Sequence, residues 1–437
     1  MIADRNRARA FRLAAPALGL ALLLASTAAT ARAEILAGAS VRIITPDPLL
    51  PISGGMGPTR PAKEKRGELT ARALVIRKGD VTVGVVALDL LGFPSVLADR
   101  VRALVPRIAA DNILIGSTHT HSAPDCYALP DGKGGHSGDL AYMDLVCRRA
   151  AEALNEAIDR LEPARIRVAT DEAKGRIAYN YYAPDLYDRR MGVIQAVRGD
   201  GEAIATLVNY AVHPEVLGNE VGILGPDLVG PLCDELEAKA GGVALFMNGA
   251  QGGMVTADNR LLDEPGDPVR GYWKDARTWD ECLRIGRLMA GEALRIVADA
   301  PLQDDPKLAC RAKVVKLPVE SDLMWAVVVH SPLKYPRGED RTVSTRINLV
   351  ELGDARILTI PGEALPNIGF YLKRKMGAGP NFLFGLTNDA FGYILTRVDF
   401  HSFPRYDYIS RTSLGEETGE ILISESLKLV EEAVKSR

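Results

Sequence analysis

Cysteine, histidine and surplus charge are all scarce in this sequence. The five cysteines form no Cys-x-x-Cys pair, so cysteine is a poor candidate for a metal site. A net charge of −3 without a basic run leaves no electrostatic footprint for nucleic acid and does not suggest binding to anionic membranes. Beyond the N-terminus no segment approaches 18 uninterrupted apolar residues, so no later membrane span is expected. The composition is otherwise ordinary for a globular protein, 47% hydrophobic and 25% charged.

The first 33 residues have the pattern of a signal peptide. Four arginines between residues 5 and 12 precede a Leu/Ala-rich run from Leu13 to Leu24, and Ala31-Arg32-Ala33 forms an A-x-A cleavage site. We expect secretion or export to the periplasm, with a mature chain that begins near Glu34. The alternative is an uncleaved membrane anchor, but the apolar run is short for a membrane span.

An exported chain favours disulfide formation, because its compartment is oxidising. One or two disulfides are therefore expected, and the odd number of cysteines leaves at least one free thiol. Their spacing does not assign the pairs. The cysteines are Cys126, Cys147, Cys233, Cys282 and Cys310.

Strand and helix patterns alternate along the mature chain. Residues 72–76 and 81–88 read as a hairpin around Lys78-Gly79-Asp80. A helix is expected from Ser95 to about Ile108, followed by a strand from Ile113, which makes a βαβ unit. A polar stretch, 262–277, is expected to be an exposed excursion. Further strands are expected at 41–44, 166–169, 191–197, 204–210, 243–247, 308–317, 346–352, 356–360 and 381–386, and further helices at 140–160, 226–239, 281–300 and 413–435.

These elements predict a single α/β catalytic domain over residues 34–437. Its β-sheets should be mixed and flanked by helices, because βαβ units and hairpins occur in the same chain. Open α/β sheets place their sites beyond the carboxyl ends of the strands, so we expect a metal site there.

Two of the six histidines, His119 and His121, follow the buried strand that begins at Ile113. Side chains two apart on an extended segment face the same way, so both imidazoles can reach one point. Imidazole is a common zinc ligand. A His-x-His pair also occurs by chance on exposed strands, but its place at a strand end favours metal binding here.

Later strand ends also deliver polar groups. His213 follows the strand 204–210, Glu363 follows 356–360, and Tyr393 comes soon after 381–386. Taken singly, His213 also fits a hydrogen-bonded core histidine, Glu363 a helix N-terminal carboxylate, and Tyr393 a half-buried tyrosine. The glycine-rich stretch 248–253 either brings backbone amides to a ligand or is a tight turn.

Five segments in order along the chain together resemble the catalytic domain of the neutral/alkaline, non-lysosomal ceramidase family. The most specific is Thr118-His119-Thr120-His121-Ser122. The others are residues 66–73 (RGELTARA), 209–213 with the later Gly225-Pro226-Asp227, Pro361-Gly362-Glu363, and 388–393 (NDAFGY). The family's separate C-terminal immunoglobulin-like domain is expected to be absent.

The resemblance implies one zinc ion per chain, held by His119, His213, Glu363 and Tyr393. It implies that His121 lies beside the metal as a second-shell residue or proton shuttle. Two imidazoles, a carboxylate and a phenol oxygen suit zinc, and a catalytic zinc site keeps a position for water.

Two departures from the family pattern bear on the reaction. Gly253 stands where the family has its proposed serine nucleophile, so an acyl-enzyme through that position is excluded. Zinc-bound hydroxide would then attack directly, with His121 as base and the amides around Gly253 as extra donors. Tyr181 replaces an arginine of the family's Asn-Arg-Ser-Pro segment, which puts ceramide itself in doubt as the substrate.

The leading hypothesis is an exported zinc hydrolase of an N-acyl amide bond in a small or amphiphilic compound, with peripheral membrane contact compatible with such a substrate. Alternatives are a zinc-dependent esterase and a non-catalytic relative that keeps its metal. A metallo-β-lactamase-like hydrolase would need His-x-His-x-Asp-His, but Ala123 and Pro124 stand where its Asp-His should be.

Overall fold

A computed structural model describes residues 33–131, 133–267 and 272–435 of the chain. Residues Glu34–Arg437 form one compact unit. The predicted signal peptide lies, except for Ala33, outside the described residues. Within the described ranges, no helix combines the length and the apolar composition that a membrane span requires.

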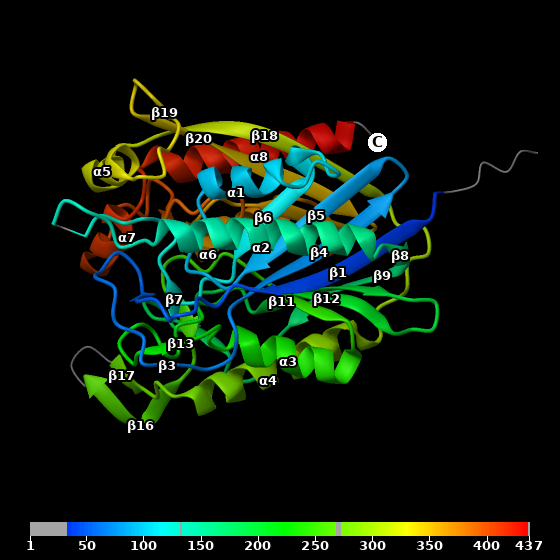
Figure 1. Cartoon of the computed structure of the whole chain (residues 1–437), viewed down its shortest axis with the longest axis horizontal. Helices are drawn as coiled ribbons and strands as arrows, with labels where there is room; N and C mark the ends of the chain where they lie inside the picture. The colour runs from blue at the N-terminus through cyan, green and yellow to red at the C-terminus, as the bar shows by residue number, and fades with distance from the viewer. Residues whose placement is uncertain (1–32, 132, 268–271, 436–437) are drawn as a thin grey trace, which may run out of the picture. The chain divides into compact units, whose positions relative to one another are not determined.

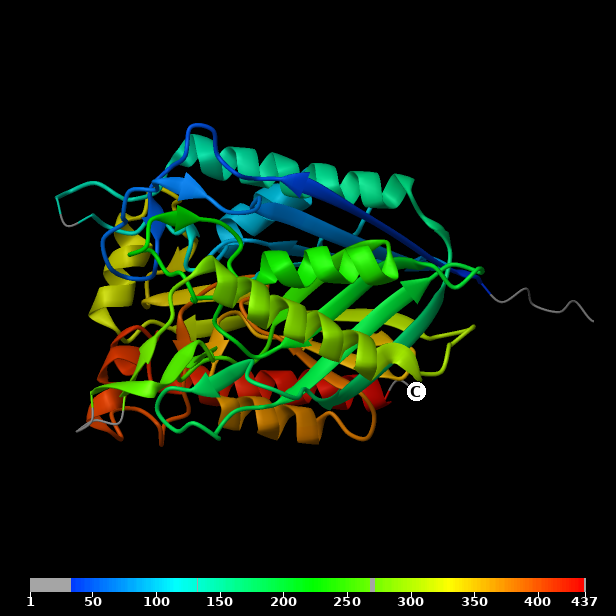
Figure 2. The same cartoon turned by 90° about the horizontal axis from the view of Figure 1, so that it is seen from below.

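Three β-sheets form the frame of the unit (Figures 1 and 2). The first sheet has the order β6-β5-β4-β1-β8 and the second the order β14-β12-β11-β9. The third has the order β18-β20-β21-β23. The strands are β1 (Ile35–Ile43), β4 (Thr70–Lys78), β5 (Val81–Leu88), β6 (Ile113–Ser117), β8 (Glu162–Pro163), β9 (Arg165–Glu172), β11 (Arg190–Val197), β12 (Ala203–Tyr210), β14 (Val243–Asn248), β18 (Leu308–Pro318), β20 (Thr342–Leu352), β21 (Ala355–Thr359) and β23 (Asn381–Phe384).

Helices cover the outer face of each sheet. Helix α2 (Leu140–Asp159) packs on β1 and β4, and the pair α3 (Val229–Ala240) and α4 (Trp279–Ala298) packs on the second sheet. Helices α6 (Pro366–Lys375) and α8 (Glu417–Lys435) pack on the third. In Figure 2, α2 lies along the first sheet, and the α3–α4 pair is separate from the red α8. The mixed α/β architecture predicted from the sequence is confirmed.

A central apolar core lies where the inner faces of the three sheets meet. Alternate residues of each strand point into it, as the pleat requires. Leu74 and Ile76 of β4 face this core, whereas Val75 faces the core under α2. The residues that the other strands contribute include Val83, Val85, Leu114, Ile194, Leu207, Leu245, Val350, Ile357 and Phe384.

Each sheet contributes one parallel strand pair, and these pairs converge. The pairs are β5 with β6, β12 with β14, and β21 with β23. Strands β6, β14 and β23 are the edges of their sheets, and backbone bonds join these edges: Ser117 N donates to Leu386 O at 3.1 Å and Gly385 N to Asn248 O at 2.9 Å. The carboxyl ends of six strands therefore meet in one region.

Two buried amides hold this junction together. The Asn209 side chain donates to Met247 O, Asn248 O and Leu383 O at 2.9–3.0 Å. The Asn248 side chain donates to Thr118 O and Val212 O at 3.1 and 2.7 Å. Each amide satisfies carbonyls that a buried strand end would otherwise leave unpaired.

Several element boundaries differ from the sequence prediction for local reasons. The predicted hairpin and the βαβ unit are confirmed, but α1 (Ser95–Ala103) ends before Ile108 because Pro106 disfavours helix in the residue before it. Helix α3 starts at Val229 because Asp227 has a φ of +54°. The excursion at 262–277 is a ribbon of β16 (Arg260–Asp267) and β17 (Tyr272–Asp275).

The sequence pattern missed α5 (Asp322–His330) and α6, and the shortest elements. Helix α5 is nearly all apolar and rich in valine, which favours strand over helix in a local reading. The short elements are β2 (Ile52–Ser53), β3 (Glu64–Lys65), β7 (Ala123–Pro124), β10 (Ala178–Asn180), β13 (Ile223–Leu224), β15 (Val255–Ala257), β19 (Arg337–Gly338), β22 (Glu363–Ala364), β24 (Tyr393–Ile394), η1 (Ala110–Asn112), η2 (Pro404–Tyr406) and α7 (Asp407–Arg411).

The expectation of one or two disulfides is wrong, because all five cysteines are free thiols. Cys126 and Cys147 belong to the core beside α2, and Cys233 and Cys282 belong to the core between α3 and α4. Each packs as a small hydrophobic residue. Burial raises the pKa of the Cys147 and Cys233 thiols to about 12, which keeps them protonated and inert.

We therefore expect that a reducing agent leaves the stability unchanged. The thermal midpoint measured with and without dithiothreitol should agree within about 1 °C, since no covalent cross-link is lost. A drop of several degrees on reduction would show that a disulfide contributes to the fold.

Two glycines offer a matched test of the packing between sheets. A Cβ on Gly192 of β11 would lie 2.3 Å from Cε1 of Phe382 in β23, so Gly192→Ala should cost about 1–3 kcal/mol by overpacking. The control is Gly291→Ala at an exposed position of α4, where a Cβ meets nothing within 4 Å; it should stabilise by up to about 1 kcal/mol. Urea unfolding measures both, and equal effects would contradict the close packing of β11 on β23.

Candidate metal centre

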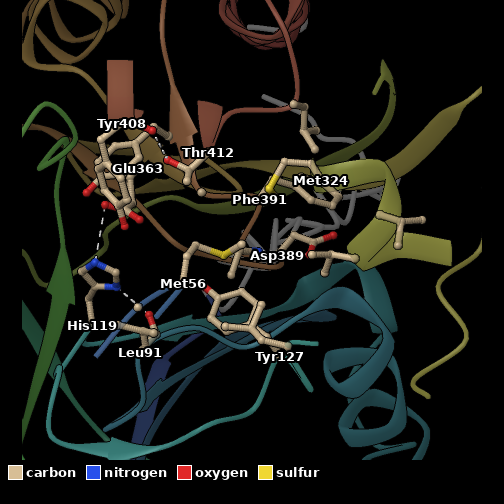
Figure 3. Close-up of a pocket in the computed structure, with 18 of the residues that line it drawn as sticks. Met56, Leu91, His119, Tyr127, Met324, Glu363, Asp389, Phe391, Tyr408 and Thr412 are labelled. Atoms are coloured by element: carbon tan, nitrogen blue, oxygen red, sulfur yellow. Dashed lines mark hydrogen bonds and ion pairs between the residues drawn. The ribbon is translucent and has the colours of Figure 1, made fainter. Parts of the chain in front are cut away.

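His119 lies in the turn that follows β6. Its backbone has a φ of +71°, a left-handed conformation that costs about 1–2 kcal/mol outside glycine. Hydrogen bonds fix it in place: His119 N donates to Leu90 O at 2.9 Å, and its Nδ1 lies 2.5 Å from Leu91 O. Figure 3 shows the ring held between Leu91 and Glu363. Strain at this position is consistent with a functional constraint.

His213 follows β12 and is held in a similar way. Its backbone N donates to Val255 O at 2.8 Å, and its Nδ1 lies 2.9 Å from the same oxygen. Asn248 fixes the preceding residue, because Val212 O accepts from its side chain. The ring is fully buried, and its Nε2 faces Glu363.

Glu363 and Tyr393 are brought together by backbone pairing. Strands β22 and β24 run parallel, and Glu363 lies opposite Tyr393 in their register. Glu363 Oε2 lies 3.0 Å from His213 Nε2 and 3.4 Å from His119 Nε2. Two of the four predicted ligands, His119 and His213, therefore converge on a carboxylate oxygen of the third, Glu363, and the fourth lies opposite Glu363 in the strand register.

The chemistry of these contacts fits a cation. Each Nδ1 that faces a backbone carbonyl carries a proton, so each neutral ring presents a lone pair at Nε2. Two lone pairs then point at a carboxylate oxygen, an arrangement that needs positive charge between them. Burial opposes ionisation of Glu363 and His213. Even so, His119 and then His213 lower the pKa of Glu363, and the contact with Glu363 and the charge of Glu215 raise the pKa of His213. His119, His213 and Glu363 thus suit a metal ion.

His121 joins the same cluster. The nitrogen atoms of His119, His121 and His213 lie within 4.8 Å of one another and could hold a metal ion. The two histidines of the His-x-His pair meet as predicted, with ring centroids 4.8 Å apart. They do not meet on an extended strand, because the chain turns at His119. His121 Nε2 is buried and has no hydrogen-bond partner among the described residues.

Glu215 is a member of the site that the sequence analysis did not single out. Its Oε2 lies 3.7 Å from His121 Nδ1. Burial alone would raise the pKa of this carboxyl. The opposing effect of His121 and His213 is larger, so the pKa is lowered overall. Burial and the neighbouring histidines lower the pKa of His121 to about 3 despite Glu215. The one sequence signal was its position, two residues after His213.

Tyr393 lines the site as an intact phenol. Its hydroxyl lies 3.2 Å from Met254 Sδ, and its ring lies 5.9 Å from that of Tyr408. Burial, reinforced by the charge of Glu363, raises its pKa well above the ordinary value. In this arrangement Tyr393 is a proton-bearing group beside Glu363, and its place among the metal ligands stays a prediction.

Gly253 lies in a loop that packs against β22. Its φ is +67° and that of Met254 is +66°, and a Cβ on Gly253 would lie 3.2 Å from Leu365 Cγ. Two neighbouring amides already have acceptors, because Gly249 N donates to Tyr210 O and Gly252 N to Ala364 O. Among the three glycines of this loop, the predicted use of backbone amides as donors to substrate therefore narrows to Gly253.

An apolar cavity opens beside the cluster (Figure 3). Its empty volume, open solvent included, is about 790 Å³. His119, His121, Glu363 and Tyr393 lie in its wall. Helix α5 supplies part of the apolar lining through Met324, Val327 and Val328. A small, largely apolar compound can thus reach the polar cluster.

Comparison with known proteins places the fold. No family model matches the chain, and no curated protein sequence matches it. Among solved structures it is similar to the neutral ceramidase from Pseudomonas aeruginosa, with a TM-score of 0.74 and 16% identity over 92% of this chain and 75% of that chain. It is also similar to a ceramidase complexed with C2, with a TM-score of 0.74 and 17% identity over 92% and 76%. The chain has a neutral ceramidase-like fold, as the resemblance predicted, and is divergent in sequence.

Removal of one predicted ligand should strongly weaken metal binding. We expect the purified wild-type protein to bind one zinc ion, and His213→Ala to lower the affinity by more than about 100-fold, beyond the 10–100-fold typical of outer-shell changes. The control is His330→Ala, an exposed histidine at the end of α5, which should bind zinc like the wild type. Metal analysis after dialysis measures both, and a His213→Ala protein that keeps its zinc would contradict the site.

Proposed function

We propose that the protein is an exported, zinc-dependent hydrolase of amide bonds in N-acyl, lipid-like compounds. One observation carries the proposal: the Glu363 carboxylate lies between the Nε2 atoms of His119 and His213, in the wall of an apolar cavity. The ceramidase fold supports the reaction class, and one of the similar structures is a complex with C2. Export rests on the signal-peptide pattern in residues 1–33.

His119, His213, Glu363 and Tyr393 would hold the zinc ion. When bound, zinc lowers the pKa of a water molecule and polarises a carbonyl oxygen. The remaining chemistry belongs to side chains of the chain itself. His121 Nε2 has no hydrogen-bond partner among the residues that the structure describes, so it is free to accept the proton of an attacking water.

Glu215 and Tyr393 support that proton transfer. Glu215 Oε2 faces His121 Nδ1, and the negative charge stabilises the imidazolium as it forms. A neutral phenol accepts through its oxygen and donates through its proton, so Tyr393 would keep a hydrogen bond for a developing oxyanion while its oxygen faces the metal. Gly253 has no hydroxyl, which leaves direct attack by water rather than an acyl-enzyme through that position.

Substrate turnover distinguishes this proposal from two alternatives. An esterase would use the same groups, because an ester carbonyl presents the same oxygen to them. A non-catalytic relative would bind zinc without turnover. A panel of matched N-acyl amides and esters, assayed with zinc-loaded protein, distinguishes the three: amide cleavage supports the proposal, cleavage of esters alone supports the esterase, and no cleavage supports the non-catalytic relative.

The His121→Ala variant tests whether His121 acts as a general base or as a metal ligand. We expect its amidase activity to fall by roughly 10²–10⁴-fold, the usual contribution of general-base catalysis, while its zinc content stays at the wild-type level. His330→Ala again serves as the control. Loss of zinc from His121→Ala would instead make His121 a ligand, and unchanged activity would exclude it as the base.

A further inference from the structure

A second cleft lies at the C-terminal end of α6, the orange helix of Figure 2. Its empty volume, open solvent included, is about 1280 Å³. None of the residues that line this α6 cleft also lines the apolar cavity beside the metal cluster. Three of them are cations, Arg190, Lys373 and Arg374. The cleft is therefore a separate and differently charged place on the molecule.

The positive charge of the α6 cleft has no acidic counterpart in its lining. No aspartate or glutamate is among the described residues that line it. Arg374 is exposed and pairs with no carboxylate in the described part of the chain, and its guanidinium carbon lies 5.6 Å from the centroid of the Tyr371 ring. Such a local excess of positive charge attracts anions.

One buried carboxylate fixes two of the three cations in place. The Asp188 side chain is 5% exposed. Its two oxygens accept from Nε and Nη2 of Arg190, each at 2.8 Å, and its Oδ2 also accepts from Lys373 Nζ at 3.0 Å. Burial alone would raise the pKa of Asp188, but Lys373 and Arg190 lower it overall. Groups that are already held in position lose less entropy when a ligand binds to them.

These contacts leave donors for a ligand. The Lys373 side chain is only 10% exposed, and of its three N–H groups only one has an acceptor among the described residues. Arg190 Nη1 likewise has no acceptor there. Burial lowers the pKa of Lys373, and Asp188 offsets only part of that effect. An anion beside the ammonium would therefore stabilise its charged form.

The negative end of the α6 dipole does not cancel this charge. The Asn381 side chain donates to Lys373 O and Gly377 O at 3.0 and 2.7 Å, and the Arg356 guanidinium donates to Met376 O. The carbonyls at the end of the helix are thus already hydrogen-bonded. Three cations and the single carboxylate of Asp188 leave two positive charges.

This combination selects a phosphate monoester among small anions. The phosphate group carries a charge of about −1.5 to −2 at pH 7 and three acceptor oxygens, whereas a carboxylate carries one negative charge. Guanidinium groups bind phosphate through two parallel hydrogen bonds, and lysine binds it as a point charge. Phe370 lies in the same lining, with its ring centroid 5.8 Å from the guanidinium carbon of Arg190, and offers an apolar surface to the organic part of the ester.

We propose that the α6 cleft binds a phosphate monoester, as a free compound or as a lipid headgroup, through Arg190, Lys373 and Arg374. The proposal goes beyond the hydrolase function and does not depend on it, because the cleft shares no residue with the metal cluster.

The test is isothermal titration of the zinc-loaded protein with glycerol 3-phosphate, in a buffer without phosphate or sulfate. We expect glycerol 3-phosphate to bind and glycerate, its carboxylate counterpart, to bind more weakly. Arg374→Gln should lower the affinity by roughly three- to tenfold, the loss of one exposed charge-assisted contact. Ala378→Glu, which adds a carboxylate at an exposed position of the lining, should lower it by more.

The matched controls are Arg148→Gln and Ala141→Glu, the same changes at exposed positions of α2. Both should bind glycerol 3-phosphate like the wild type. The two cleft variants alter exposed residues and remove no contact of Asp188, so their thermal midpoints should match that of the wild type. Absence of binding to the wild type, equally tight binding of glycerate, or full affinity in both cleft variants would overturn the proposal. The last outcome would also be seen if the phosphate were bound at zinc.

Vesicles identify the source of the phosphate group. Flotation compares phosphatidylcholine vesicles with and without phosphatidic acid, whose headgroup is a phosphate monoester. Recruitment of the wild type but not of Arg374→Gln by phosphatidic acid supports a lipid headgroup as the ligand. Binding of glycerol 3-phosphate without recruitment supports a free compound. Amide cleavage by Arg374→Gln should equal that of the wild type, so failure of the anion site and failure of the hydrolase proposal are separate results.

Discussion

The structure depends on one electrostatic constraint at the junction of its sheets. Leu91 O and Val255 O accept from Nδ1 of His119 and His213, which turns both Nε2 lone pairs toward the Glu363 carboxylate. Such a cluster is stable only with positive charge at its centre, a metal ion or protons. Three parallel strand pairs end around it, and the Asn209 and Asn248 amides hold those ends together. The packing of the three sheets therefore determines where the cluster lies.

The polar groups around the cluster include no hydroxyl at position 253, because that residue is glycine. The sulfur of the next residue, Met254, contacts the Tyr393 phenol. Glu215 faces His121. A site without a serine nucleophile but with a carboxylate beside a neutral imidazole is suited to water activation. The ceramidase-like fold thus carries a set of polar groups of its own, as expected where function is determined by the site rather than the fold.

Much of the fold was predictable because its signals are local. The hairpin of β4 and β5 has a Gly-Asp turn between apolar runs, and α2 has an uninterrupted helical periodicity. Both ends of β5 and α2 were therefore predicted to within one residue, and those of β4 to within two. Helix α5 was missed because its valines favour a strand until the helix packs on the cavity. The disulfide prediction failed because compartment and cysteine count say nothing about distance. Four of the thiols are part of a packed core, and Cys310 packs against another.

The sequence alone determined which residue types follow which strands: His119 and His121, His213, Glu363 and Tyr393 each stand just after an apolar run. It could do so because strand formation and its termination are decided within a few residues. Only the tertiary structure decided that these ends meet, which ring nitrogens face Glu363, and that Glu215 lies beside His121. Contacts such as that of His213 with Glu363, 150 positions apart, depend on how three sheets pack rather than on any local pattern.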